Sequence, residues 1–301
     1  MNPRASAQGP DNRIDGILLA SAGAIAFSGK AIIVKLAYRY GVDAVTLIMY
    51  RMLFALPLFL ALSWWAGRDK PPLSGADLRL LGGLGFSGYY LASFLDFSGL
   101  QYISANLERL ILYLNPTFVL AIGALLFHTP VTRKQCIALL VSYLGVCLVF
   151  GHDVTVVGPH IVLGSVLVLA SAFSYATYLV FSGQALKRLG AIRITGVASS
   201  IACLLCIAQF FILRSPSAMI VAPEVIGLSV LNATLCTVLP ILLVMFAIER
   251  VGASVAAQAG IIGPLSTIFM SVLILGEPFT AWLAAGTVLV LLGIWLLTRW
   301  K

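Results

Sequence analysis

The chain has 301 residues, of which 60% are hydrophobic and only 10% are charged, whereas soluble domains carry about 25% charged residues. This composition excludes a soluble globular domain and predicts an all-α membrane protein. The net charge of +8 comes from Lys and Arg residues scattered among short polar stretches. It therefore indicates membrane topology rather than a face that binds nucleic acid.

Apolar runs bounded by charged residues, Gly and Pro predict ten membrane-spanning helices of about 20 residues each. In chain order we expect them at residues 16–38, 44–65, 78–100, 104–127, 133–150, 160–182, 192–213, 223–247, 253–275 and 280–298. No stretch between them is long enough to fold as a separate soluble domain.

Positive charge is distributed unevenly between alternate loops. Thirteen Lys and Arg residues fall at the two ends and in one set of loops, and only Lys35, Arg39 and Arg214 fall in the other set. Because positive loops stay in the cytoplasm, we expect both termini there. Residues 1–15 are polar and are expected to form a disordered cytoplasmic tail. The first apolar run is too interrupted for a cleaved signal peptide.

The sequence contains an internal repeat with a constant offset of 148 positions. Pro116, Pro130, Thr132, Leu144 and Gly145 match Pro264, Pro278, Thr280, Leu292 and Gly293 without a gap. The repeat predicts two five-helix units, at residues 16–152 and 158–301. Because five is an odd number, the second unit enters the membrane in the opposite direction. We therefore expect two inverted repeats around a central cavity.

Two features resemble a known family. Residues 276–280, Gly-Glu-Pro-Phe-Thr, are similar to the turn before the last helix of the EamA-type, ten-helix members of the drug/metabolite transporter superfamily, and Pro116 and Pro264 are similar to their mid-helix prolines. The first copy of the turn, at 128–132, departs from this pattern. Residues 99–116 look most like the YddG-type aromatic amino-acid exporters. The resemblance implies export of amino acids with aromatic or other hydrophobic side chains across a bacterial inner membrane.

Charged side chains within a membrane span are costly and usually face a cavity or a partner. Five residues meet this description: Lys30, Arg51, Asp96, Glu108 and Arg109. We expect Lys30 and Glu108 to bind the substrate, with Lys30 at a carboxylate. Arg51, Asp96 and Arg109 are expected to form an outer gate or ion-pair layer. The alternative for both arginines is that they snorkel to the membrane surface.

Pro116 and Pro264 are expected inside spans, where a proline removes a backbone hydrogen bond and frees a carbonyl group. Freed carbonyls are tolerated in membrane helices where they border a cavity. Both prolines are therefore candidate hinges, and Asn115, beside Pro116, is a candidate substrate ligand. The alternative is a packing kink without a ligand.

Aromatic and amide side chains complete the candidate site. The aromatic candidates are Tyr90, Tyr113, Tyr175 and Tyr178, and the amide candidates are Asn232 and Gln258. The tyrosines lie deeper than the aromatic belts at membrane surfaces, and aromatic walls with polar tips suit a small amphipathic ligand. For each residue, helix packing with an interhelical hydrogen bond is the alternative.

The sequence as a whole predicts a secondary carrier that works by alternating access. The alternatives are an exporter of drugs or other small metabolites with the same fold and, from another class, a membrane-embedded lipid-handling enzyme. The sequence has no Walker-type phosphate loop and no metal-ligand spacing, so we expect no enzymatic activity, cofactor or metal. The expected partners are a small-molecule substrate and the lipid bilayer, with proton coupling, no nucleic acid and a functional monomer.

Overall fold

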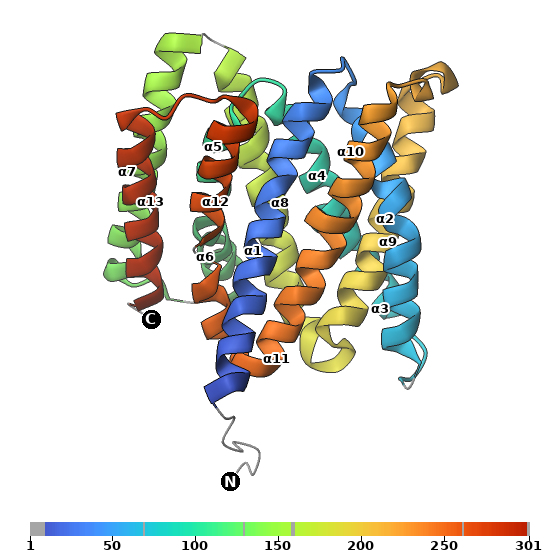
Figure 1. The fold of residues 1–301 in the computed structure, drawn as a ribbon. Coiled ribbons are helices and arrows are strands. Elements are labelled where there is room, and N and C mark those ends of the chain that lie inside the picture. The colour runs from blue at the N-terminus through green and yellow to red at the C-terminus, as the bar shows by residue number, and fades with distance from the viewer. Residues whose placement is uncertain (1–9, 69, 129, 158–159, 261, 300–301) are drawn as a thin grey trace.

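In the computed structural model, the chain folds into helices that stand side by side (Figure 1). The structure describes residues 10–68, 70–128, 130–157, 160–260 and 262–299, and every regular element within them is helical. The first half contains α1 (Pro10–Tyr38), α2 (Ala44–Gly67), α3 (Gly75–Leu84), the π-helix η1 (Gly85–Leu91), α4 (Ala92–Leu100), α5 (Ala105–Leu112), α6 (Asn115–Phe127) and α7 (Arg133–Val157).

The second half follows the same plan. It contains α8 (His160–Leu189), α9 (Ala191–Leu213), the 3₁₀ turn η2 (Pro216–Met219), α10 (Pro223–Ala233), the π-helix η3 (Thr234–Val238), α11 (Leu239–Ala259), α12 (Ile262–Met270), the π-helix η4 (Ser271–Leu275) and α13 (Ala281–Arg299). Seven of the described helical segments are long and apolar enough to span a membrane, and two more are shorter apolar helices. With the continuous rod α3–η1–α4, these make the ten predicted spans.

The two halves enter the bundle from opposite sides. In Figure 1, α1 begins and α13 ends at the lower end, which we call the terminal side, whereas α7 ends and α8 begins at the upper end, which we call the far side. The helix contacts follow the same symmetry. α2 packs on its counterpart α9 and α7 on its counterpart α13, while α1 against α11 and α8 against α4 are equivalent contacts. The predicted all-α fold of two inverted repeats is confirmed.

The repeated glycines explain how α7 and α13 approach each other closely. A Cβ atom on Gly145 would lie 2.6 Å from the carbonyl oxygen of Gly286, and one on Gly293 would lie 2.6 Å from that of Ala138. Gly286 and Ala138 are themselves equivalent positions of the two repeats. Small residues let membrane helices pack backbone to backbone, so this part of the sequence repeat serves the contact between the last helices of the two units.

The helices around the centre are interrupted at matching places. The π-helix η1 in the third span corresponds, 148 positions later, to η3 in the eighth. The turn at Tyr113 and Leu114, between α5 and α6, lies one position from Leu112, the counterpart of Gly260 in the turn before α12. Such irregular backbone is tolerated at membrane depth where it is buried in protein or borders a cavity.

The structure corrects the predicted start of the ninth span. We expected a loop around Arg250 and a helix from 253, but α11 continues without a break to Ala259, and the next helix begins at Ile262. In the first repeat the side chain of Ser104 caps α5 by accepting a hydrogen bond from the Leu107 N–H. Its counterpart is Gly252, which has no side chain to cap a new helix, and a single glycine costs a helix only about 1 kcal/mol.

Candidate functional site

A cavity of about 560 Å³ lies between the two repeats. Its lining comes from both units, and many lining residues form pairs that are 148 positions apart. Such pairs are Phe27 and Tyr175, Lys30 and Tyr178, Tyr89 and Thr237, Asp96 and Val244, Leu112 and Gly260, and Asn115 and Gly263. The pseudo-symmetry therefore relates the two walls of the cavity. The charged members of these pairs belong to the first repeat.

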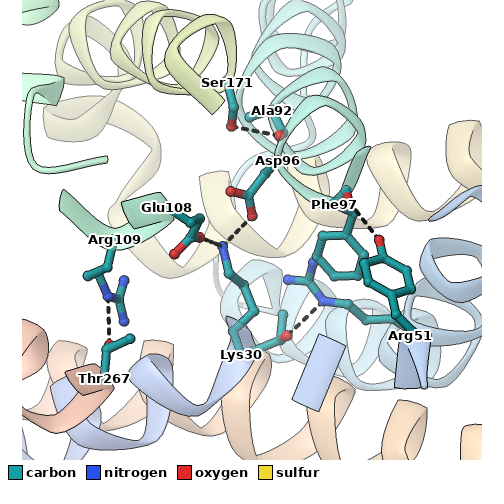
Figure 2. A network of polar contacts seen from close by, with 11 residues as sticks. Lys30, Arg51, Ala92, Asp96, Phe97, Glu108, Arg109, Ser171 and Thr267 are labelled. Atoms are coloured by element: carbon teal, nitrogen blue, oxygen red, sulfur yellow. Dashed lines mark hydrogen bonds and ion pairs between the residues drawn. The ribbon is translucent and has the colours of Figure 1, made fainter. Parts of the chain in front are cut away.

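Three of the predicted charged residues form one buried cluster. The Lys30 ammonium on α1 lies 2.5 Å from Asp96 Oδ2 on α4 and 3.3 Å from Glu108 Oε1 on α5 (Figure 2). All three side chains are buried. We call Lys30, Asp96 and Glu108 the ionic triad. It has two carboxylates for one ammonium, and Lys30 and Asp96 line the cavity while Glu108 lies behind them.

Arg51, on α2, also lines the cavity. Its Nε donates a 3.1 Å hydrogen bond to the Thr237 hydroxyl, and its guanidinium lies 5.1 Å from the centre of the Phe97 ring (Figure 2). Thr237 belongs to η3 and donates in turn to the carbonyl oxygen of Asn232, five residues earlier. The π-helix thus orients the hydroxyl that holds Arg51.

Arg109, on α5, is held by hydroxyls from one helix of each repeat. Its Nε donates to Thr267 Oγ1 on α12 and its Nη2 donates to Ser28 Oγ on α1, both at 2.9 Å. Ser28 also donates to the carbonyl of Gly263 at the start of α12. Arg51 and Arg109 are both buried and point into the bundle, so the structure does not support the snorkelling alternative.

The predicted aromatic residues divide between the cavity and the surrounding core. Tyr113, Tyr175 and Tyr178 line the cavity, and the rings of Tyr175 and Tyr178 stack with 5.6 Å between centroids. Tyr90 lies outside the cavity and packs beside Phe86. Neighbouring residues on a helix point in directions about 100° apart, so a residue next to Tyr90 can face the cavity while Tyr90 does not. The π-helix η1 changes the directions of these side chains further.

Two aromatic lining residues were absent from the sequence-based set. Tyr89 lies next to Tyr90, lines the cavity and donates a 3.2 Å hydrogen bond to the Tyr178 hydroxyl. Phe27 also lines the cavity. The repeat carried a signal that could have found it, because Phe27 is the counterpart of the predicted Tyr175. The counterpart of Tyr89 is Thr237, whose hydroxyl holds Arg51 but which was also absent from the sequence-based set.

The amide candidates occupy different environments. Asn115 lines the cavity. Asn232 is buried outside the lining, and neither side-chain amide atom has a hydrogen-bond partner among the described residues. Gln258 belongs to α11, but its side chain lies outside the described part of the structure.

The candidate hinges Pro116 and Pro264 lie in first turns rather than in helix interiors. Pro116 is the second residue of α6 and Pro264 the third of α12. A proline in the first turn removes an N–H group that has no intrahelical partner anyway, so each proline helps to begin a helix after a break. This corrects the expected interior kink.

On the far side, beyond the residues that line the cavity, side chains bind backbone carbonyls. Three residues near the end of α1 link it to neighbouring segments. Lys35 Nζ donates to Leu100 O at 3.2 Å and to Ile103 O at 3.0 Å. Tyr38 Oη donates to Phe97 O at 2.6 Å, and Arg39 Nη2 donates to Leu275 O at 2.7 Å. On the terminal side, the lining extends to Ser182 near the end of α8 and Ala191 at the start of α9.

Glu277, in the loop before α13, adds another contact on the far side. Its carboxylate accepts hydrogen bonds from the backbone N–H groups of Ala105, at 2.9 Å, and Asn106, at 3.4 Å. It therefore caps the N-terminus of α5, where backbone N–H groups lack intrahelical partners. Burial raises the pKa of Glu277, and the two N–H groups and Lys35 oppose this shift.

Comparison with known proteins supports a transport function. The sequence matches the EamA-like transporter family twice, over residues 14–151 and 162–299. An uncharacterized transporter of Bacillus subtilis, YcbK, is 31% identical over 270 residues, covering 87% of this chain and 86% of the relative. An uncharacterized transporter of Archaeoglobus fulgidus is 23% identical over 283 residues, covering 93% and 96%.

A solved crystal structure superposes with a TM-score of 0.66 and 14% sequence identity, covering 95% of this chain and 99% of the other. At this identity the similarity shows the fold alone. The two family matches are decisive, because the second begins and ends 148 positions after the first and together they span nearly the whole chain. The chain is an integral membrane protein that belongs to the EamA-like transporter family, within the drug/metabolite transporter superfamily.

Proposed function

We propose that this chain exports amino acids with aromatic or other hydrophobic side chains across the bacterial inner membrane, with both termini in the cytoplasm. The mixed lining of the cavity supports this proposal. Charged groups such as Lys30 and Asp96 share one cavity with the rings of Tyr113, Tyr175 and Tyr178. Ligand pockets typically measure roughly 300–1,000 Å³ and combine apolar walls with a few polar groups, and a cavity of about 560 Å³ falls in this range.

The ionic triad has a defined part in this proposal. Both carboxylates already contact the Lys30 ammonium, so Lys30 is not a free cation for a substrate carboxylate. Asp96 and Glu108 instead offer acceptors for the substrate's ammonium group. The aromatic side chains would hold its apolar part.

Two alternatives make different demands on the cavity. An exporter of cationic drugs calls for a wide, net-negative pocket, whereas the cavity and its triad contain three cations, Lys30, Arg51 and Arg109, and two carboxylates, Asp96 and Glu108. We therefore favour a zwitterionic substrate. A lipid-handling enzyme would instead require a nucleophile activated by a neighbouring base.

Alternating access requires that the two sides of the cavity open in turn. Lys35, Tyr38 and Arg39 hold the far side through a few hydrogen bonds to backbone carbonyl groups, and such bonds can be exchanged without breaking a helix. We propose that their release opens the far side while the terminal side closes. A monomer contains both repeats and is the functional unit in this scheme.

Proton coupling follows from the stoichiometry of the triad. Two buried carboxylates share one ammonium, and within the described residues neither oxygen of Glu108 has a hydrogen-bond partner. An ionised carboxylate without such partners is costly to bury, so we propose that Glu108 carries a proton that is released when a substrate ammonium binds.

Counterflow in proteoliposomes tests the proposed function. Vesicles loaded with unlabelled L-phenylalanine should accumulate external labelled L-phenylalanine above the level of protein-free vesicles, and an imposed pH gradient should change the rate. L-leucine should compete more strongly than L-lysine. No accumulation with any hydrophobic amino acid would contradict the proposed substrate class.

A further inference from the structure

The charges at the cavity do not balance. Asp96 and Glu108 both contact Lys30, and among the described residues neither Arg51 nor Arg109 has a carboxylate within 4.0 Å. Buried charges are normally paired, since an unpaired ion in a low-dielectric interior is costly. The cavity therefore has a surplus of positive charge, which a bound anion would neutralise.

Of the two arginines, Arg51 has more unused hydrogen-bonding capacity. Arg109 uses two of its nitrogens, Nε and Nη2, on hydroxyl groups. Arg51 uses only Nε, on Thr237, and its buried Nη1 has no partner among the described residues. A guanidinium group carries five N–H donors, so most of the donors of Arg51 have no partner among the described residues.

The surroundings of Arg51 hold its guanidinium in place beside the cavity. Its side chain is 5% exposed, Phe97 packs against the guanidinium, and the Thr237 hydroxyl fixes Nε. A preorganised guanidinium binds a carboxylate through two parallel N–H···O bonds, which a lysine ammonium cannot reproduce. Arg51 thus has the properties of a carboxylate receptor.

We propose that Arg51 is the carboxylate-binding residue of the carrier and that the site selects substrates bearing one carboxylate on an aromatic or aliphatic body, whether or not they also carry an amine. This inference rests on the proposed carrier function and deepens it. With the proton proposed on Glu108, the triad is neutral when the ligand lacks an ammonium group, so hydrophobic carboxylates that are not amino acids belong to the same substrate class.

Three probes that share a phenyl ring separate the two functional groups. 3-Phenylpropionate has the carboxylate without the amine, 2-phenylethylamine has the amine without the carboxylate, and L-phenylalanine has both. Calorimetric titration of each probe into the purified wild-type protein should show binding of 3-phenylpropionate and no binding of 2-phenylethylamine at the same concentrations. Failure of 3-phenylpropionate to bind, or equal binding of the amine, would overturn the inference.

Variants assign the effect to Arg51. Hydrogen bonds to charged groups contribute about 1.5–3 kcal/mol, so Arg51→Gln should weaken 3-phenylpropionate binding about tenfold or more, and Arg51→Lys should give an intermediate loss. Arg193→Gln is the matched control, because Arg193 is also buried and hydrogen-bonded, to Pro71 O, but lies outside the lining. Unchanged binding by folded Arg51→Gln protein would overturn the inference.

The same experiment separates this inference from the proposed function. Arg51-dependent binding of 3-phenylpropionate without counterflow of any amino acid would support the carboxylate site and contradict amino-acid export. Counterflow of L-phenylalanine that persists at the wild-type rate in Arg51→Gln would support amino-acid transport and contradict the assignment of Arg51.

Discussion

At the scale of single residues, the central polar groups are joined by specific contacts rather than by general proximity. Lys30 bridges Asp96 and Glu108, while hydroxyl groups hold Arg51 and Arg109. All five charged residues could be found in the sequence because charge within a span is rare. Their partners could not, because each contact joins helices that are distant in the chain and depends on helix rotation.

Glu108→Gln should uncouple transport from pH. Glu108 faces the Lys30 ammonium, which Asp96 on α4 also contacts, and Arg109 follows it on α5. The glutamine keeps the shape and the hydrogen-bonding capacity but cannot gain or lose a proton. Initial rates of L-phenylalanine counterflow between pH 5 and 8 should vary in the wild type and stay flat in the variant. An unchanged pH profile in Glu108→Gln would count against proton release at this residue.

At the scale of helices, hydropathy predicted where most spans lie, because a long apolar run can satisfy its backbone in lipid only as a helix. It did not predict the interruptions. The π-helix η3 and the continuation of α11 to Ala259 depend on packing and on the absence of a capping side chain at Gly252. Glycines such as Gly145 reveal close helix contacts only once the partner helix is known.

Gly145→Ala should weaken the contact between α7 and α13. The added methyl group would lie 2.6 Å from the Gly286 carbonyl oxygen, and overpacking of this kind typically costs about 1–3 kcal/mol. Gly151→Ala is the control on the same helix, because a Cβ atom at Gly151 meets nothing within 4 Å. Thermal unfolding in detergent should show a lower midpoint for Gly145→Ala only. Equal midpoints for the two variants would contradict the proposed close contact.

Glu277 should make the free energy of unfolding depend on pH. Burial raises its pKa above the unfolded value, so over the intervening pH range the folded protein binds more protons than the unfolded chain. The free energy of unfolding attributable to this residue therefore falls as pH rises through that range. Glu277→Gln cannot titrate and should lack this slope.

Unfolding midpoints of wild type and Glu277→Gln, measured from pH 4 to 8, check this prediction. The difference between the two proteins should change in favour of the variant as the pH rises. Glu224→Gln, at an exposed position in the first turn of α10, controls for loss of a surface charge. A constant difference between the two midpoints at every pH would show that folding does not change the protonation of Glu277 in this range, and it would contradict the prediction.

At the scale of the whole molecule, the sequence repeat predicted the architecture because an odd number of spans per unit forces inversion. It also related the cavity walls, as the pair Phe27 and Tyr175 illustrates. The repeat could not predict the contacts on the far side. They depend on residues whose counterparts differ, such as Lys35 and Tyr38, which bind carbonyl groups there and whose counterparts are Gly183 and Leu186.

Alternating access is the central claim, and paired distances between spin labels test it most directly. One label pair at Tyr40 and Phe279 reports on the far side, and a second at Gly183 and Arg250 reports on the terminal side; all four positions are exposed. In proteoliposomes, saturating L-phenylalanine should populate longer far-side distances and shorter terminal-side distances in the same sample. Distances that stay unchanged, or that change in the same direction at both sides, would contradict a carrier that opens its two sides in turn.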